Sequence, residues 1–261
     1  MPDHELVDVN LGHLMNKVPE VTIWFWVIKV LCTTVGETFA DYLNETRGFG
    51  LTKTTIVMAV SLAAAITWQF RTARYRPFAY WLTVVLVSVV GTLVTDNLTD
   101  RWGVSLRLST SVFSLLLAGV FLLWFRTEGT ISNHSIRTGR REAFYWATIL
   151  TTFALGTAAG DLVSEQFNLG YANAVVAFGI AIILVVIARK TLRLGSDFAF
   201  WSAYILTRPL GGSIGDFLST DKHDGGLGLG TTGTSIVFLA IILGIVGYLT
   251  ISKVDVMSDQ V

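Results

Sequence analysis

Apolar stretches about as long as a bilayer is thick recur along the chain, and they constrain its fold more than any other feature. Six of them contain no charged residue: 54–70, 77–95, 108–125, 143–160, 166–188 and 231–250. Two more, 21–43 and 198–217, have similar length but include Lys29, Glu37 and Arg208. A helix needs about 20 apolar residues to cross the hydrocarbon core of a membrane. The sequence therefore predicts an all-α, polytopic membrane protein with eight transmembrane helices.

The charge content excludes several classes of protein. Only 15% of the residues are charged, and the 19 Lys and Arg residues equal the Asp and Glu residues in number. This composition excludes a soluble enzyme and offers no basic surplus for binding nucleic acid. The single cysteine and the four histidines form no metal-binding run. No histidine lies near a serine of the repeated motif, and Cys32 has no activating partner beyond Lys29 one turn earlier, so we do not expect an enzyme.

A four-fold internal repeat is the second strong feature of the sequence. In each copy a tryptophan is followed by a glycine ten residues later and an aspartate fifteen residues later, with a small residue directly before the aspartate. The tryptophans are Trp26, Trp81, Trp146 and Trp201; the glycines are Gly36, Gly91, Gly156 and Gly211; the aspartates are Asp41, Asp96, Asp161 and Asp216. Each copy contains two predicted spans, so all four copies enter the membrane in the same direction.

The repeat and the positions of the basic residues together predict the organisation of the chain. The repeats cover 21–72, 76–126, 142–190 and 197–252. The two tails and the loops after even-numbered spans contain twelve Lys and Arg residues, whereas the loops after odd-numbered spans contain five. Because basic residues are retained in the cytoplasm, we expect both termini there, with 1–20 and 253–261 as cytoplasmic tails and 127–141 as a cytoplasmic loop.

Tandem two-span repeats with a characteristic tryptophan resemble a bacterial membrane-protein family, domain of unknown function family 347. The opening segment KVPEVTIWFWVIKVLCTTVGETFADYL is similar to the first repeat of that family, and the likeness covers nearly the whole chain. The resemblance implies a multi-pass, eight-span protein of the bacterial cytoplasmic (inner) membrane. It implies no activity.

The small residues of the repeat favour close helix packing. The glycine and the small residue before the aspartate are four positions apart on one helix face, which lets another helix approach closely. The odd-numbered helices should therefore form the core of the bundle, with the even-numbered helices outside. The packing glycines are Gly36, Gly91, Gly156, Gly160 and Gly215. The four tryptophans fall near the cytoplasmic boundary, where we expect them to anchor the helices at the membrane interface.

The repeat aspartates are the first candidates for function. Fifteen helical residues place them about 22 Å from the tryptophans, near the outer helix ends, where the helix dipole disfavours a carboxylate. If the repeats surround one axis, the four carboxylates converge into an acidic ring that binds a cation. In the alternative interpretation the aspartates form salt bridges that only fix the loops, with Arg47, Lys53, Arg101 and Arg107 as partners.

Glu37 is a further candidate because it lies within an apolar stretch, one turn before Asp41 on the same helix face. A carboxylate inside the membrane is costly and marks a functional position by default. Lys29 and Arg208 are the basic residues deep in the predicted spans, and either one can neutralise Glu37. An Arg208 that faced the acidic ring would instead favour an anionic ligand.

The seventh span differs from the others. Pro209 lies in its middle and is followed by Gly211 and Gly212. We therefore expect the helix to be interrupted here, with freed backbone carbonyls that act as a gate or as ion ligands. A packing kink without a ligand is the alternative.

These candidates support three functional hypotheses. The first is a transporter or channel for a hard cation such as Mg²⁺, Mn²⁺ or Ca²⁺, because oxygen ligands prefer hard ions. The second is a non-transporting structural or sensory membrane protein whose Asp, Trp and Gly repeat serves helix packing. The third is a lipid-modifying or small-molecule-binding enzyme that uses Glu37, Lys29 and Arg208. The expected partners are the lipid bilayer and a small inorganic ion, and homo-oligomer formation stays open.

Overall fold

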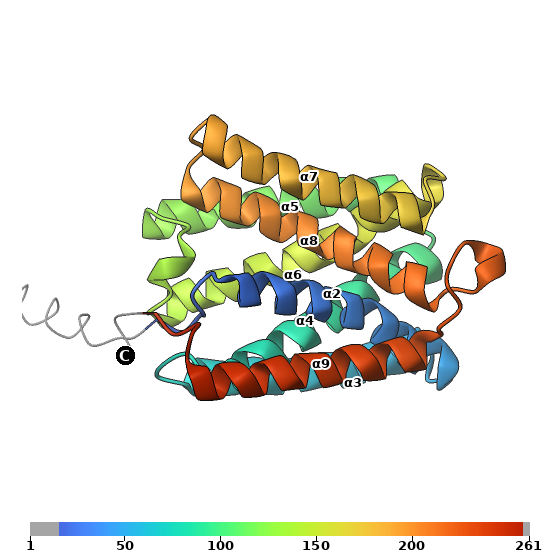
Figure 1. Ribbon diagram of the computed structural model, residues 1–261, viewed down its shortest axis with the longest axis horizontal. Helices are drawn as coiled ribbons and strands as arrows, with labels where there is room; N and C mark the ends of the chain where they lie inside the picture. The colour runs from blue at the N-terminus through green and yellow to red at the C-terminus, as the bar shows by residue number, and fades with distance from the viewer. Residues whose placement is uncertain (1–15, 258–261) are drawn as a thin grey trace, which may run out of the picture.

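The computed structural model describes residues 16–257, and this part of the chain consists of helices and loops without a β-strand (Figure 1). Its eight long helices are α2 (Ile23–Asp41), α3 (Gly50–Arg71), α4 (Pro77–Asp96), α5 (Leu106–Glu128), α6 (Gly139–Asp161), α7 (Tyr171–Thr191), α8 (Ser196–Ser219) and α9 (Thr231–Ser252). Seven of them are long and apolar enough to cross a membrane; α8 is as long but more polar. The predicted all-α, polytopic membrane fold is confirmed. Most of the predicted N-terminal tail and residues 258–261 lie outside the described residues.

The four helices that carry the repeat motif form a closed ring. α2 packs against α4, α4 against α6, α6 against α8, and α8 returns to α2. The other four helices lie outside, and each packs on the ring helix of the next repeat: α3 on α4, α5 on α6, α7 on α8 and α9 on α2. Figure 1 shows the ring between α5 and α7 on one side and α3 and α9 on the other. The outer helices leave most of their apolar surface uncovered, which suits a lipid surrounding.

Neighbouring ring helices touch at the glycine ten residues after each tryptophan. A Cβ atom on Gly91 would lie 2.7 Å from the Cβ atom of Phe153, closer than side chains approach. The same contact recurs around the ring in the pairs Gly36–Ser88, Gly91–Phe153, Gly156–Arg208 and Gly211–Thr33. In every pair the second residue lies seven positions after a repeat tryptophan. Each repeat therefore presents the same glycine to the same position of the next repeat, and the ring has four-fold pseudosymmetry.

Helix α8 runs unbroken through Pro209, so the predicted interruption of this span is wrong. A proline removes its own N–H from the helical hydrogen bonds, yet the residues that follow Pro209 stay helical and pack against α2. The Thr33 hydroxyl donates a hydrogen bond to the carbonyl oxygen of Thr207 at 3.2 Å, and Gly211 lies directly against Thr33. The glycines after Pro209 therefore allow a close helix approach and do not form a break.

Three of the four repeat tryptophans are buried in the protein interior. Trp81, Trp146 and Trp201 expose only 1%, 3% and 3% of their surface. The prediction that they anchor the helices at the membrane interface is wrong, because their rings face the inside of the bundle and not the lipid. Trp26 differs, since its ring is only partly buried.

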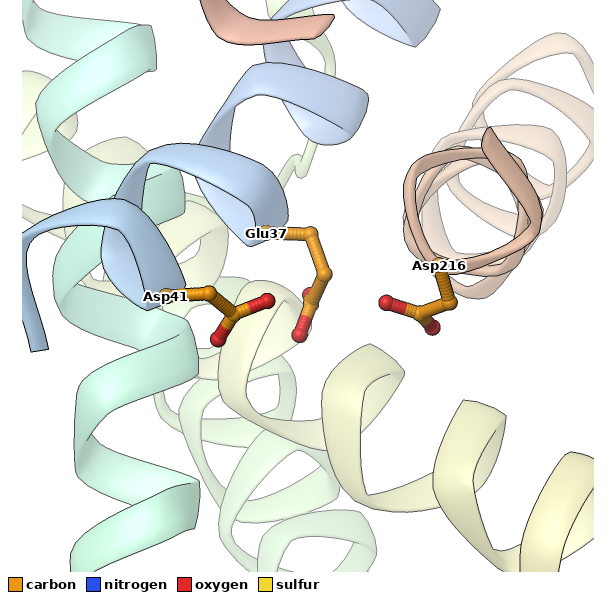
Figure 2. A group of neighbouring side chains, drawn as sticks. All are labelled: Glu37, Asp41 and Asp216. Atoms are coloured by element: carbon orange, nitrogen blue, oxygen red, sulfur yellow. The ribbon is translucent and has the colours of Figure 1, made fainter. Parts of the chain in front are cut away.

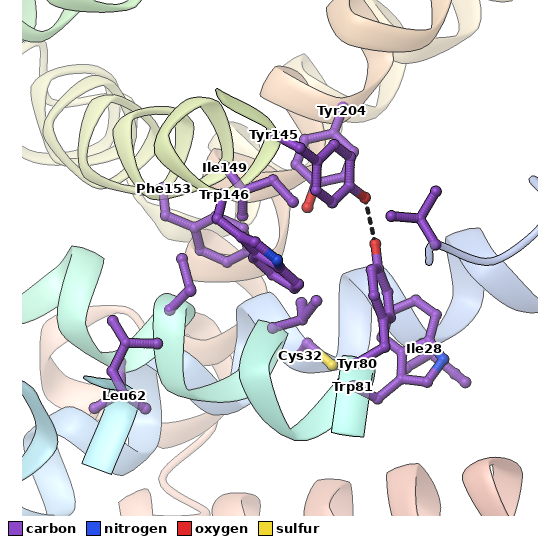
Figure 3. Packing of buried hydrophobic residues seen from close by; sticks show 14 of the residues in the cluster. Ile28, Cys32, Leu62, Tyr80, Trp81, Tyr145, Trp146, Ile149, Phe153 and Tyr204 are labelled. Carbon is purple, nitrogen blue, oxygen red and sulfur yellow. Dashed lines mark hydrogen bonds between the residues drawn. The ribbon is translucent and has the colours of Figure 1, made fainter. Parts of the chain in front are cut away.

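Aromatic side chains fill the ring near the helix ends that carry these tryptophans. The rings that contact one another are Phe25, Tyr80, Trp81, Tyr145, Trp146, Trp201 and Tyr204, which we call the aromatic layer. The hydroxyl groups of Tyr80 and Tyr145 are hydrogen-bonded at 2.5 Å inside this layer (Figure 3). The layer therefore closes the axis of the ring at this level.

The first and last described residues cover the same end of the bundle, which we call the termini end. Lys17 is buried and forms an ion pair with Glu142 of α6 at 2.8 Å. The Glu20 N–H donates to the carbonyl oxygen of Asp255, whose carboxylate accepts a hydrogen bond from the Tyr75 hydroxyl at 2.5 Å. The opposite end, where the repeat aspartates lie, we call the acidic end.

Candidate cation site

The four repeat aspartates surround one cavity at the acidic end. Asp41, Asp96 and Asp161 are the last residues of α2, α4 and α6, and Asp216 lies near the end of α8. The cavity has a volume of about 290 Å³. Its lining consists of Glu37, Asp41, Asn44, Asp96, Thr99, Asp100, Leu106, Asp161, Glu165, Tyr171, Asp216 and Thr220. The structure thus brings together the carboxylates that the repeat spacing placed at one depth.

Three of the four ring helices widen into a π-helical turn directly after their aspartate, which the sequence did not reveal. These turns are Tyr42–Thr46, Asn97–Arg101 and Leu162–Gln166. Such turns occur often at functional sites because they redirect side chains within a helix. Here Asp100 and Glu165, each four residues beyond a repeat aspartate, line the same cavity. The turns therefore add a second tier of carboxylates to the first.

Three carboxylates lie close enough to share one metal ion. Oxygen atoms of Glu37, Asp41 and Asp216 are all within 4.8 Å of one another. Figure 2 shows the three side chains converging from two helices, α2 and α8. Glu37 is 8% exposed, so this group reaches from the cavity into the interior of the ring.

Arg208 is the partner of Glu37 and lies beneath the cavity on the axis of the ring. Its Nη2 atom donates to Glu37 Oε2 at 2.7 Å and to the Thr157 hydroxyl at 2.8 Å, and it also donates to the Thr92 hydroxyl. The side chain of Arg208 is 1% exposed. Of the two basic residues that the sequence offered as partners for Glu37, the fold selects Arg208. The guanidinium thus joins three ring helices beneath the carboxylates.

The residues around the guanidinium occupy one position of the repeat. Glu37, Thr92, Thr157 and Gly212 each lie eleven residues after a repeat tryptophan. A Cβ atom on Gly212 would lie 2.8 Å from Arg208 Nη1, so the glycine leaves the guanidinium its present position and a larger residue would displace it. Gly212 is therefore a positioning residue for Arg208.

Lys29 takes no part in this ion pair. Its Nζ atom lies 4.1 Å from the ring centres of both Phe153 and Tyr204, and it has no hydrogen-bond partner among the described residues. The amine thus lies against two aromatic rings. Lys29 therefore belongs to the interior next to the aromatic layer and not to the acidic cavity.

Three of the loop bases that the sequence offered as partners for the aspartates have other contacts. Arg47 and Arg107 lie over the rings of Tyr42 and Phe167, and Arg101 donates to the Thr52 hydroxyl. Among the described residues, Asp96, Asp161 and Asp216 form no ion pair with a base. The interpretation of these three aspartates as loop-fixing salt bridges is not supported.

Comparison with known proteins identifies the repeat. The family model described as Repeat of Unknown Function (DUF347) matches four times, at residues 24–75, 79–130, 144–193 and 199–255. No curated protein and no solved structure matches the chain.

Proposed function

The chain belongs to the DUF347 repeat family, and because the description of that family names no activity, we propose from the site alone that the protein transports a hard, divalent cation. The membrane would be the bacterial inner membrane. The excess of basic residues in the tails and in the loops of the termini end supports an orientation with both termini in the cytoplasm. The acidic cavity then opens to the outside.

One observation carries this proposal, the convergence of carboxylates from all four repeats on one cavity. Seven carboxylates line it, and its described lining contains no lysine or arginine. Carboxylates held this close repel one another, and a cation removes that repulsion. Rings of acidic side chains attract and select cations in membrane proteins for the same reason.

The chemistry of the cavity favours a hard ion. Its charged ligands are all oxygen atoms, which Mg²⁺, Mn²⁺ and Ca²⁺ prefer. Oxygen ligands on opposite sides of Ca²⁺ are about 5 Å apart, and those around Mg²⁺ about 4 Å apart. The oxygen atoms of Glu37, Asp41 and Asp216 lie within 4.8 Å of one another, so small side-chain movements would enclose either ion.

Arg208 would compete with the transported ion for the carboxylate of Glu37. Its guanidinium occupies Glu37 Oε2, one of the oxygen atoms that a bound metal ion would use. An arriving cation would draw Glu37 toward Asp41 and Asp216 and weaken its bond to Arg208. The hydroxyl groups of Thr92 and Thr157 would hold the guanidinium meanwhile.

The closed axis favours a transporter over an open channel. Below the cavity the ring contains Arg208, then Lys29 between two aromatic rings, and then the aromatic layer. An ion that enters the cavity from the acidic end would meet these groups and could not pass without a rearrangement. Alternating exposure of the site to the two sides agrees with this arrangement.

Cation flux into proteoliposomes that contain the purified protein tests the proposal. Mg²⁺, Mn²⁺, Ca²⁺ and K⁺ should be compared, with and without a proton gradient. Asp161→Asn removes one carboxylate from the cavity and should lower the flux of the transported ion about tenfold or more. Asp197→Asn is the matched control, because Asp197 lies in the first turn of α8, at the termini end. Equal flux for the wild type and Asp161→Asn would overturn the proposal.

A cation sensor without transport is the second candidate, and the closed axis is the observation that favours it. In that case divalent cations should raise the unfolding midpoint of the wild type but not of Asp161→Asn, while no ion crosses the liposome membrane. Flux above that of empty liposomes would exclude the sensor.

A further inference from the structure

A second cavity lies at the termini end, on the outside of the bundle. It has a volume of about 350 Å³ and forms where α3 turns into α4 and where α9 ends. One part of its lining is apolar, with Phe78, Ala79 and Leu249. Trp68 completes this part, its ring centre 6.1 Å from that of Phe78, and both rings are about half exposed. The cavity therefore offers an apolar wall to the surrounding lipid.

Three basic side chains border this cavity. Arg74 and Arg76 come from the turn between α3 and α4, and Lys253 follows the last residue of α9. All three are exposed, and none forms an ion pair with a described residue. Asp255 does not neutralise them, because it is buried and bonded to the Tyr75 hydroxyl at 2.5 Å, and burial raises the pKa of its carboxyl. The rim of the cavity is therefore positively charged.

The depth of the cavity matches the membrane surface. The span of α3 ends at Arg71 and that of α9 at Ser252, directly beside the basic rim. Exposed tryptophan side chains such as Trp68 lie at the level of lipid headgroups in many membrane proteins. The apolar part of the cavity then reaches into the bilayer while its basic rim reaches the water.

We propose that this cavity is a binding site for an anionic phospholipid. The phosphate and the charged headgroup would lie against Arg74, Arg76 and Lys253, and an acyl chain would lie along Trp68 and Phe78. Basic clusters directly beside membrane spans recognise anionic headgroups in this way. A zwitterionic lipid fits less well, because its ammonium group would meet three cations. The inference is independent of cation transport, since it uses none of the residues of the acidic cavity.

Lipid binding to the purified, delipidated full chain tests this site. Phosphatidylglycerol and phosphatidylcholine with identical acyl chains are titrated, and bound lipid is counted by native mass spectrometry. The wild type should prefer phosphatidylglycerol. Arg74→Gln with Lys253→Gln should weaken phosphatidylglycerol binding about thirtyfold and leave phosphatidylcholine binding unchanged. Arg126→Gln with Arg193→Gln removes the same charge away from the cavity and should leave the preference intact.

Two further variants separate the loss of charge from a loss of folding. Arg74→Lys with Lys253→Arg preserves the charge and should bind phosphatidylglycerol like the wild type. The single variant Arg74→Gln should lose about fivefold in affinity, and it serves if the double variant unfolds, as judged by tryptophan fluorescence. Equal affinity of the wild type for both lipids would overturn the proposal, because the cavity would then take acyl chains whatever the headgroup. Unchanged phosphatidylglycerol binding by the folded glutamine variants would overturn it as well.

Discussion

Arg208→Gln is the most informative single substitution, because it removes the cation that contacts the acidic cavity from below. Arg208 is 1% exposed and Glu37 is 10% exposed at the side chain, so their ion pair is buried. Removing one partner of a buried pair costs about 3–5 kcal/mol of folding free energy, because the other charge is left without a partner. Oxygen atoms of Asp41 and Asp216 lie within 4.8 Å of the same group, and their repulsion places the loss in the upper part of this range.

A divalent cation should repair this loss if the proposed site exists. A ligand present at a hundred times its Kd stabilises a folded protein by about 2.7 kcal/mol. In Arg208→Gln the carboxylate of Glu37 is available to the metal ion, so the cation should return more than half of the lost stability. The wild type should gain less, because the metal ion has to displace the guanidinium from Glu37 first.

Thermal unfolding followed by tryptophan fluorescence measures both effects in detergent. The divalent cation is compared with a monovalent salt of equal ionic strength, so that general screening is subtracted. Glu37→Gln with Arg208→Gln removes both charges and should recover most of the stability without any cation. Arg140→Gln is the matched surface control, since Arg140 is 70% exposed beside Glu128 and should lose less than about 1 kcal/mol. An Arg208→Gln protein as stable as the wild type, or one that ignores divalent cations, would refute the reasoning.

Three other substitutions test the packing and the termini end, each by its unfolding midpoint. Gly91→Ala should destabilise by about 1–3 kcal/mol because its Cβ overlaps the next ring helix, whereas Gly179→Ala on the outer face of α7 meets nothing within 4 Å and should be neutral or stabilising; equal effects would contradict the ring contact. Tyr75→Phe removes the hydrogen bond to Asp255. Since burial raises the folded-state pKa of Asp255, the stability due to this group is full below the unfolded pKa of about 3.9 and is lost as the pH rises through the folded pKa. The Tyr75 hydrogen bond favours the ionised carboxylate, so the deficit of Tyr75→Phe should grow as the pH rises above the unfolded pKa of Asp255, and a deficit independent of pH would count against this assignment. Lys29→Met should be neutral or stabilising, because the amine has no hydrogen-bond partner among the described residues and methionine has a similar volume; a large loss would reveal a partner for Lys29.

The sequence predicts the level at which a residue lies in the membrane better than it predicts which way its side chain points around the helix. The fifteen-residue spacing from Trp81 to Asp96 placed the aspartates at one level, and the structure brings all four to one cavity. The same spacing placed Trp81 near the end of its helix but could not tell whether its ring faces lipid or protein. That choice depends on which helices are neighbours, and the neighbours follow from the closed ring and not from any one repeat.

Local sequence signals for a helix break also failed to predict the structure inside the ring. Pro209 with Gly211 and Gly212 is typical of a helix break, yet α8 continues, and Thr33 and the guanidinium of Arg208 occupy the space that these glycines leave. The sequence has no recognisable signal for the π-helical turns after three of the aspartates, because the extra residue in such a turn can be of any type. In retrospect, each of these turns contains a second carboxylate four residues after the aspartate, as at Asp100.

Differences between the repeats argue that the site depends on broken symmetry. With a threonine in place of Glu37, as the second and third repeats have at the matching position, the cavity would lose one carboxylate and Arg208 would lose its ion-pair partner. Instead α2 contributes Glu37 and α8 contributes Arg208, and these two helices meet where the last repeat closes on the first. The three carboxylates that can share a metal ion come from the same two helices. A cation that pulls Glu37 away from Arg208 would therefore loosen an ion pair that holds two ring helices together beneath the cavity. The seam between α2 and α8 is where an opening of the ring should begin.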